Sequence, residues 1–314
     1  MSPARWGIVA TVKAPLREIM GFAAFHLEAG AHRIYLYLDA PDDAAAEELN
    51  AHPKLRVTQT DDRYWSKKGK RPAKHQPRQT INAADAYAKR VEVDWQAHID
   101  VDEFLICAED MRIADMLAAL PQHVLCARVR PIEALSWDGP AAQPRPFKGF
   151  ALPQPKRQEI TKTLYPRFGG HVNGGFLSHV AGKMLYRTGL PEFHVKLHNA
   201  FQGETMNPGQ IELDALKLCH MHGADWDDWI ARFHYRHTRG AYRAELSAAP
   251  GGRTMHDLLG YVMERDGQAG LRAFWDELCT PRGDLMDGLE AHGLLHWQVL
   301  DLDPLIAKHF GAAI

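Results

Sequence analysis

Two aspartates two positions apart are the residues whose type and spacing most directly suggest chemistry. Asp100 and Asp102 follow the apolar segment 95–99, which predicts a buried strand that ends at the first aspartate. In an extended chain, side chains two positions apart point to one side, so both carboxylates can face one point. A hard divalent cation such as Mg²⁺ or Mn²⁺ relieves their repulsion and keeps positions open for phosphate oxygens. The alternative is a strand-end turn whose aspartates cap backbone amides.

Strand-like and helix-like segments alternate around these aspartates. Strand patterns cover residues 7–13, 33–38, 54–58 and 95–99, and helix patterns cover 16–30, a short stretch ending at 49, and 76–90. This alternation predicts an α/β fold with a Rossmann-like, mostly parallel sheet flanked by helices. Such sheets bind ligands at the carboxyl ends of their strands, where Lys13, Asp39 and Asp100 fall.

The second half of the chain is less regular. A proline-rich stretch at 140–155 suggests an irregular loop or meander, although 124–129 still has a strand pattern. Leu216 to His222 alternate so that a strand would place His220 and His222 on one face. From residue 226 onward the pattern favours helices, and Asp303-Pro304 indicates a final short helix, so we expect a C-terminal helical extension.

The composition excludes some partners and compartments. The 314 residues carry 37 Lys and Arg against 39 Asp and Glu, a formal charge of −2, so we expect no nucleic-acid partner. No apolar run has the length of a membrane span, and the first residues lack a signal-peptide core, so a cytoplasmic protein is expected. The four cysteines form no C-x-x-C pair and are expected to be packing thiols.

These motifs resemble those of the family 2-like glycosyltransferases with the GT-A fold, in the bacterial branch that carries D-V-D-E-F after the fourth strand. The likeness is carried by Asp100–Phe104, V-A-T-V-K at 9–13, the 16–30 helix, I-Y-L-Y-L-D at 34–39, and the later segments 168–171, 182–184 and 238–242. The chain departs from the family at Ala14-Pro15, where a polar and an acidic residue are common.

The resemblance implies how the donor would be held. Thr11, Lys13 and Asp39 would contact the nucleoside, and Asp100 would share in holding the donor. Asp100 and Asp102 would together bind Mn²⁺ or Mg²⁺. A histidine late in the chain would complete the metal site, either His222 or, in its place, His220. The alternatives are a turn-initiating role for Asp39, a solvated lysine at 13 and structural histidines.

A basic segment and two carboxylates are further candidates. Residues 63–78 contain seven Lys and Arg and no acidic residue, which suits a diphosphate, an anionic membrane surface or simply a solvated loop. Arg78 is the choice for a phosphate contact, because Arg binds phosphate oxygens bidentately. If the reaction resembles that of inverting members, a carboxylate must deprotonate the acceptor, and Glu133 and Asp138 are candidates by location.

We therefore expect a GT-A glycosyltransferase domain over 1–224, with a nucleotide-sugar half at about 1–105 and an acceptor half at about 106–224, followed by the helical extension at 225–314. The expected enzyme is an inverting, hexosyltransferase-like protein that moves a sugar from a nucleotide-sugar, by preference a UDP-sugar. The expected acceptor is a saccharide or a lipid-linked molecule, in the synthesis of surface polysaccharide or glycoconjugates. Transient association with the inner membrane face is also expected. The alternatives are a non-catalytic nucleotide- or sugar-binding protein and another metal-dependent phosphate enzyme.

Overall fold

The computed structural model describes residues 2–89, 91–239 and 254–311. The chain divides into two compact units, of which the first contains Met1–Arg130, Gly182–Leu218 and Leu302–Ile314 and the second Pro131–Ala181 and Cys219–Asp301. The division falls inside strands β6 (Cys126–Ala134) and β12 (Ile211–His220), so both strands run through it.

The first unit begins with the parallel sheet that the sequence predicts. Strand β1 (Trp6–Val12) pairs in parallel with β2 (Arg33–Leu38) and β4 (Trp95–His98), and β2 pairs in parallel with β3 (Leu55–Gln59). The connections are the helices α1 (Leu16–Glu28), α2 (Asp43–Asn50), α3 (Asp62–Lys67) and α4 (His75–Ala88). Every residue of β1 is buried, as expected for a central strand covered on both faces.

The rest of the first unit extends this sheet with antiparallel strands. Strand β8 (Lys183–Arg187) pairs antiparallel with β4 and with β6, and β5 (Glu103–Cys107) pairs with β12. The strands β9 (Phe193–Val195), β10 (Ala200–Gln202) and β11 (Thr205–Met206) form a separate small sheet, and α5 is Ile113–Ala118.

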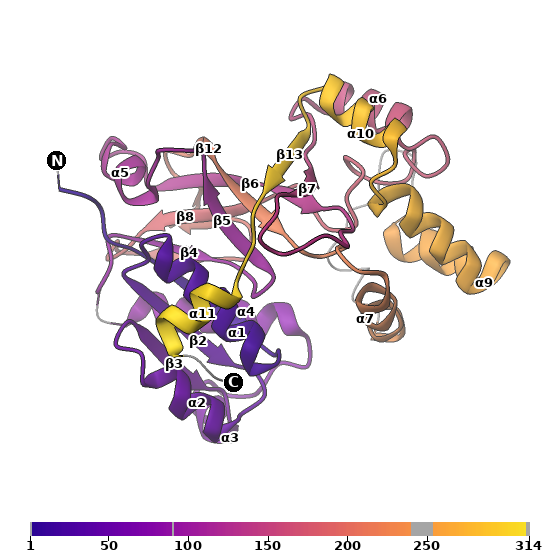
Figure 1. Ribbon diagram of the computed structural model, residues 1–314. Coiled ribbons are helices and arrows are strands. Elements are labelled where there is room, and N and C mark those ends of the chain that lie inside the picture. Colours follow the sequence, from indigo (N-terminus) through magenta and orange to yellow (C-terminus); the bar gives the residue numbers. More distant parts are fainter. Residues whose placement is uncertain (1, 90, 240–253, 312–314) are drawn as a thin grey trace. The chain divides into compact units, whose positions relative to one another are not determined.

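Helix α11 (Asp303–Phe310) ends the first unit by packing along α1 (Figure 1). A Cβ at Gly21 of α1 would lie 3.0 Å from the side chain of Leu302, so the small residue allows the close approach. Arg17 also donates to Asp303 at 2.6 Å.

The second unit combines a short sheet with the later helices. Strand β7 (Arg145–Lys148) pairs with the end of β6 and with β13 (Leu295–Gln298), so the expected irregular region at 140–155 contains a strand. The helices are α6 (Gln154–Leu164), α7 (Trp226–Arg239), α9 (Met255–Cys279) and α10 (Gly283–Ala291). A core of aromatic and aliphatic side chains, including Trp229 and Phe274, packs among them.

The expected fold class is confirmed. The strand order β3-β2-β1-β4-β8-β6, parallel up to β4 and antiparallel beyond it, forms a GT-A-like α/β sheet flanked by helices, and helices dominate the chain after β12. All four cysteines are free thiols, as predicted. Among the described residues, no helix combines the length and the apolarity required to cross a membrane. Residues 240–242 of the resemblance at 238–242 lie outside the described residues.

Candidate functional site

The D-V-D motif lies in a tight turn between β4 and β5. The amide of Glu103 donates to the carbonyl of Asp100 at 3.0 Å, and the amide of Asp100 donates back to Oε2 of Glu103 at 2.8 Å. Phe104 anchors the far side of the turn, because its ring stacks on that of His26 with an interplanar angle of 4°. The turn is therefore fixed by hydrogen bonds within it, one of them to the Glu103 side chain, and by the contact of Phe104 with α1.

Asp100 is held by two side chains that the sequence did not single out for this role. Lys183 Nζ lies 2.7 Å from Oδ2, and Gln79 of α4 donates to Oδ1. Burial would raise the pKa of the Asp100 carboxyl, but the ammonium of Lys183 outweighs it and holds this pKa well below its ordinary value. Asp100 is therefore an ionised, hydrogen-bonded carboxylate.

Asp102 faces different partners from those of Asp100. One ligand atom from each of Asp102, His220 and His222 lies within 4.8 Å of the other two, a group that could hold a metal ion. Both histidines are buried, and their ring centroids are 5.1 Å apart. Two imidazole nitrogens and one carboxylate oxygen form a donor set that suits Mn²⁺ and other transition metals.

The histidines reach this position through β12. Strand β12 pairs with β5, and the amide of Ala108 donates to the carbonyl of Ala215 at 2.9 Å, so β12 runs beside the strand that follows the D-V-D turn. The expected strand over 216–222 is too long, because β12 ends at His220 and His222 lies in the turn that follows. The prediction was that one strand would place both histidines on one face; His222 lies beyond the strand, and the two rings nevertheless lie near each other.

Asp39 lies at the end of β2, at the carboxyl edge of the sheet, and is surrounded by cations. Arg78 donates to its Oδ2 through Nε at 3.1 Å and Nη2 at 2.7 Å, Arg71 donates to its Oδ1 at 3.1 Å, and His75 lies 3.6 Å away. Burial would raise its pKa, but the neighbouring side chains of His75, Arg78 and Arg71 lower the pKa of Asp39 to about 2. The arginine expected to touch phosphate thus holds Asp39 in this structure.

Thr11 and Lys13 lie at the end of β1. The hydroxyl of Thr11 is buried and accepts a hydrogen bond from Asn82 Nδ2 at 3.0 Å, whereas Lys13 is exposed one residue beyond the strand. The carboxyl ends of β1 and β2 therefore present one buried hydroxyl and several cationic groups.

The two base candidates have very different surroundings. Glu133 is fully buried, and its carboxylate accepts from the amides of Leu177 and Ser178, from the Ser178 hydroxyl at 2.6 Å, and from Lys148 at 3.2 Å. Asp138 is exposed. The contacts of Glu133 are those of a buried structural ion pair.

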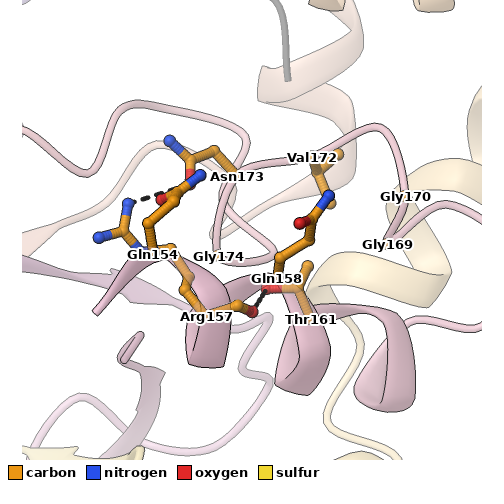
Figure 2. Close-up of a pocket in the computed structure, with 9 residues that line it drawn as sticks. All are labelled: Gln154, Arg157, Gln158, Thr161, Gly169, Gly170, Val172, Asn173 and Gly174. Carbon is orange, nitrogen blue, oxygen red and sulfur yellow. Dashed lines mark hydrogen bonds between the residues drawn. The ribbon is translucent and has the colours of Figure 1, made fainter. Parts of the chain in front are cut away.

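The second unit also contains a hollow that sequence reasoning missed. It is small and partly open to solvent, and it lies between α6 and the loop that carries Val172 and Asn173 (Figure 2). Its lining has no carboxylate, and the three guanidinium nitrogens of Arg157 already donate to Ala151, Leu152 and Asn173. Within the described part of the chain, the side-chain amides of Gln154 and Gln158 make no hydrogen bond, so these side chains remain able to bind a neutral polar ligand.

Three partners of the predicted residues were missed at the sequence level. Lys183 stands in Gly182-Lys183-Met184, which the family resemblance includes without a role, and Arg71 stands in the basic segment. Gln79 gave no signal, since an amide on a helical face has no distinctive pattern. The basic character of residues 63–78 is a signal for Arg71, whereas no local pattern links Lys183 to Asp100.

No protein-family model and no curated protein matches this chain. Among solved structures, HddC from Yersinia pseudotuberculosis is 11% identical over 67% of this chain and 90% of that chain, with a TM-score of 0.33. The galactosyltransferase LgtC, solved with donor and acceptor sugar analogues, is 13% identical over 58% and 57% of the two chains, with a TM-score of 0.27. At such TM-scores neither likeness carries weight, and fold and site rest on the contacts described above.

Proposed function

We propose that this chain is a metal-dependent glycosyltransferase that moves a sugar from a nucleoside diphosphate to a hydroxyl acceptor. The observation that carries the proposal is the grouping of Asp102, His220 and His222 beside the D-V-D turn, at the carboxyl end of β4. This is the edge at which α/β sheets bind ligands. The fold alone would not support an activity.

The donor set fits a divalent cation. A carboxylate oxygen with two imidazole nitrogens suits Mn²⁺ better than Mg²⁺, which favours oxygen ligands and near-ideal octahedral geometry. When bound, the cation would neutralise charge that develops on the departing diphosphate. Asp102, His220 and His222 would hold it, while Asp100 stays with Lys183 and Gln79.

The nucleoside end of the donor is proposed to lie over the ends of β1 and β2. Thr11, Lys13 and Asp39 are at those strand ends, and Arg78 keeps Asp39 ionised as a hydrogen-bond acceptor. A carboxylate there accepts from a base N–H or from ribose hydroxyls. The UDP preference and the inverting outcome belong to this proposal as well.

We propose that the acceptor is a saccharide held in the 106–224 half. The hollow on α6 offers the side-chain amides of Gln154 and Gln158 and has no carboxylate in its lining. Asp138, the exposed base candidate, is retained here, whereas the contacts of Glu133 favour a structural role. Gln158→Ala should raise KM for the acceptor and leave donor binding unchanged.

Membrane association is proposed from the basic segment. Arg71 and Arg78 are engaged by Asp39, and Lys68 by Asp85, whereas Lys67, Lys70 and Lys74 are exposed and have no ion-pair partner among the residues that the structure describes. Flotation of the protein with anionic and with neutral vesicles tests this. Equal recovery of protein with the two kinds of vesicle would contradict the proposed membrane association.

An assay of nucleotide release tests the proposed function. Purified protein is incubated with UDP- and GDP-sugars with and without Mn²⁺, and the freed diphosphate is measured. The proposal predicts Mn²⁺-dependent release from one donor that is lost in Asp102→Asn. A matched control is Asp301→Asn, an aspartate outside the site with the same D-x-D spacing to its neighbour. Binding without any turnover would favour the non-catalytic alternative, and metal-dependent hydrolysis of simple phosphate esters would favour another phosphate enzyme.

A further inference from the structure

Lys183 enters the D-V-D turn from a strand that is fixed on both sides. It is the first residue of β8, which pairs with β4 through Ala97 and Leu185 and with β6 through Val129 and Lys183 itself. Gly182 has a φ of +73°, and a Cβ there would lie 2.1 Å from the carbonyl oxygen of Val129. Only glycine allows the chain to pass so close to β6, so Gly182-Lys183 delivers a buried ammonium to the turn.

The ammonium group of Lys183 pairs with two carboxylates in the D-V-D turn. Lys183 has a 3% exposed side chain, and its Nζ lies 2.7 Å from Oδ2 of Asp100 and 3.2 Å from Oε2 of Glu103. Gln79 holds the other oxygen of Asp100, and the Asp100 amide holds Oε2 of Glu103. Two of the three carboxylates in the segment Asp100–Glu103 therefore point at Lys183.

We propose that Lys183 is a positioning residue that determines which divalent cation the site accepts. The inference rests on the proposed metal site. Three carboxylates in four residues would form an oxygen-rich set, which suits Mg²⁺ and Ca²⁺. By holding Asp100 and Glu103, Lys183 leaves Asp102 with His220 and His222, a mixed set that suits Mn²⁺.

The test compares Mn²⁺ with Mg²⁺ binding by calorimetry on the metal-free protein, without any assay of activity. In Lys183→Met, a neutral side chain of similar length releases Asp100 and Glu103, so the ratio of Mn²⁺ to Mg²⁺ affinity should fall on the order of tenfold, the range in which residues beside the ligands act. Lys183→Arg keeps the charge and should keep the ratio. If both affinities fell in parallel in Lys183→Met, Lys183 would only support the fold and the inference would be wrong.

Two further variants keep the inference testable should Lys183→Met not fold. Asp100→Asn should leave Mn²⁺ affinity unchanged, because Asp100 is held by Lys183, whereas Asp102→Asn should abolish binding. Equal losses in both would overturn the inference. Where Lys183→Met does fold, the double variant Lys183→Met, Asp100→Asn should restore part of the Mn²⁺ preference, since one of the two released carboxylates is gone. If the wild-type protein bound no divalent cation, the proposed function itself would fail, an outcome distinct from an unchanged ratio in the variants.

Discussion

The ion pair of Glu133 and Lys148 provides a direct test of how the interior of the second unit is stabilised. Both side chains are 0% exposed and lie 3.2 Å apart, and Lys148 also donates to the carbonyls of Gly175 and Leu278 at 2.7 Å each. Burial alone would lower the pKa of Lys148, but the nearby Cys279 and Glu133 raise it, so the lysine is charged. Glu133→Gln would leave that charge without its counterion.

The expected loss follows from these contacts. Removing one partner of a buried pair costs about 3–5 kcal/mol, and the two carbonyls that remain on Lys148 favour the lower end, about 3 kcal/mol. The amide of Gln would also direct a donor at the amide or hydroxyl of Ser178, which are donors to Glu133 now.

Urea unfolding followed by circular dichroism measures this loss in the free energy of unfolding. Asp138→Asn is the matched control, because an exposed carboxylate should change stability by less than about 0.5 kcal/mol. The double variant Glu133→Gln, Lys148→Met should recover part of the loss, since no buried charge remains. A loss under about 1 kcal/mol in Glu133→Gln, together with abolished turnover, would refute the structural interpretation and restore Glu133 as the base.

Three more predictions follow from single contacts. His26 accepts from the Leu105 amide, and burial lowers its pKa to about 3 from 6.5, so its stabilising effect is complete above pH 6.5 and is lost as the pH falls toward 3. In His26→Gln, the drop in unfolding free energy from pH 7.5 to pH 5 should be smaller by about 2 kcal/mol, and an unchanged drop would contradict this. Gly182→Ala should lower the unfolding temperature by several degrees, because its Cβ would meet the Val129 carbonyl; an unaltered melting curve would count against the close approach. Arg78→Lys should weaken nucleotide binding in calorimetry on the order of tenfold, because Lys cannot replace the two-nitrogen contact with Asp39, and full affinity would rule that contact out as a support of the site.

The first half of the fold could be predicted because its signals are local. The expected strand 33–38 coincides with β2, and the strands expected at 7–13 and 54–58 are each offset by one residue from β1 and β3, since apolar runs between glycine and proline punctuation define them. Strand β7 was missed because it has four residues and contains Pro146, which sequence rules associate with loops. Only its pairing with β13, about 150 residues later in the chain, identifies it.

The candidate site was predictable in part for the same reason. Asp100 and Asp102 stand out because strand and carboxylates are adjacent in sequence, and alternation at 216–222 draws attention to His220 and His222, although β12 ends at His220. That Asp100 pairs with Lys183 while Asp102 lies with the two histidines could not be predicted. It depends on Lys183, which is brought to the turn by antiparallel pairing across 83 residues, and no local pattern records that pairing.

The most direct test of the central claim is calorimetric titration of the protein with UDP, GDP and their sugar conjugates, with and without Mn²⁺, on wild type and Asp102→Ala. The grouping of Asp102 with His220 and His222 predicts that one diphosphate binds only with Mn²⁺ and that the variant loses this binding. Binding that is independent of metal, or that persists in Asp102→Ala, would contradict a metal-held donor site.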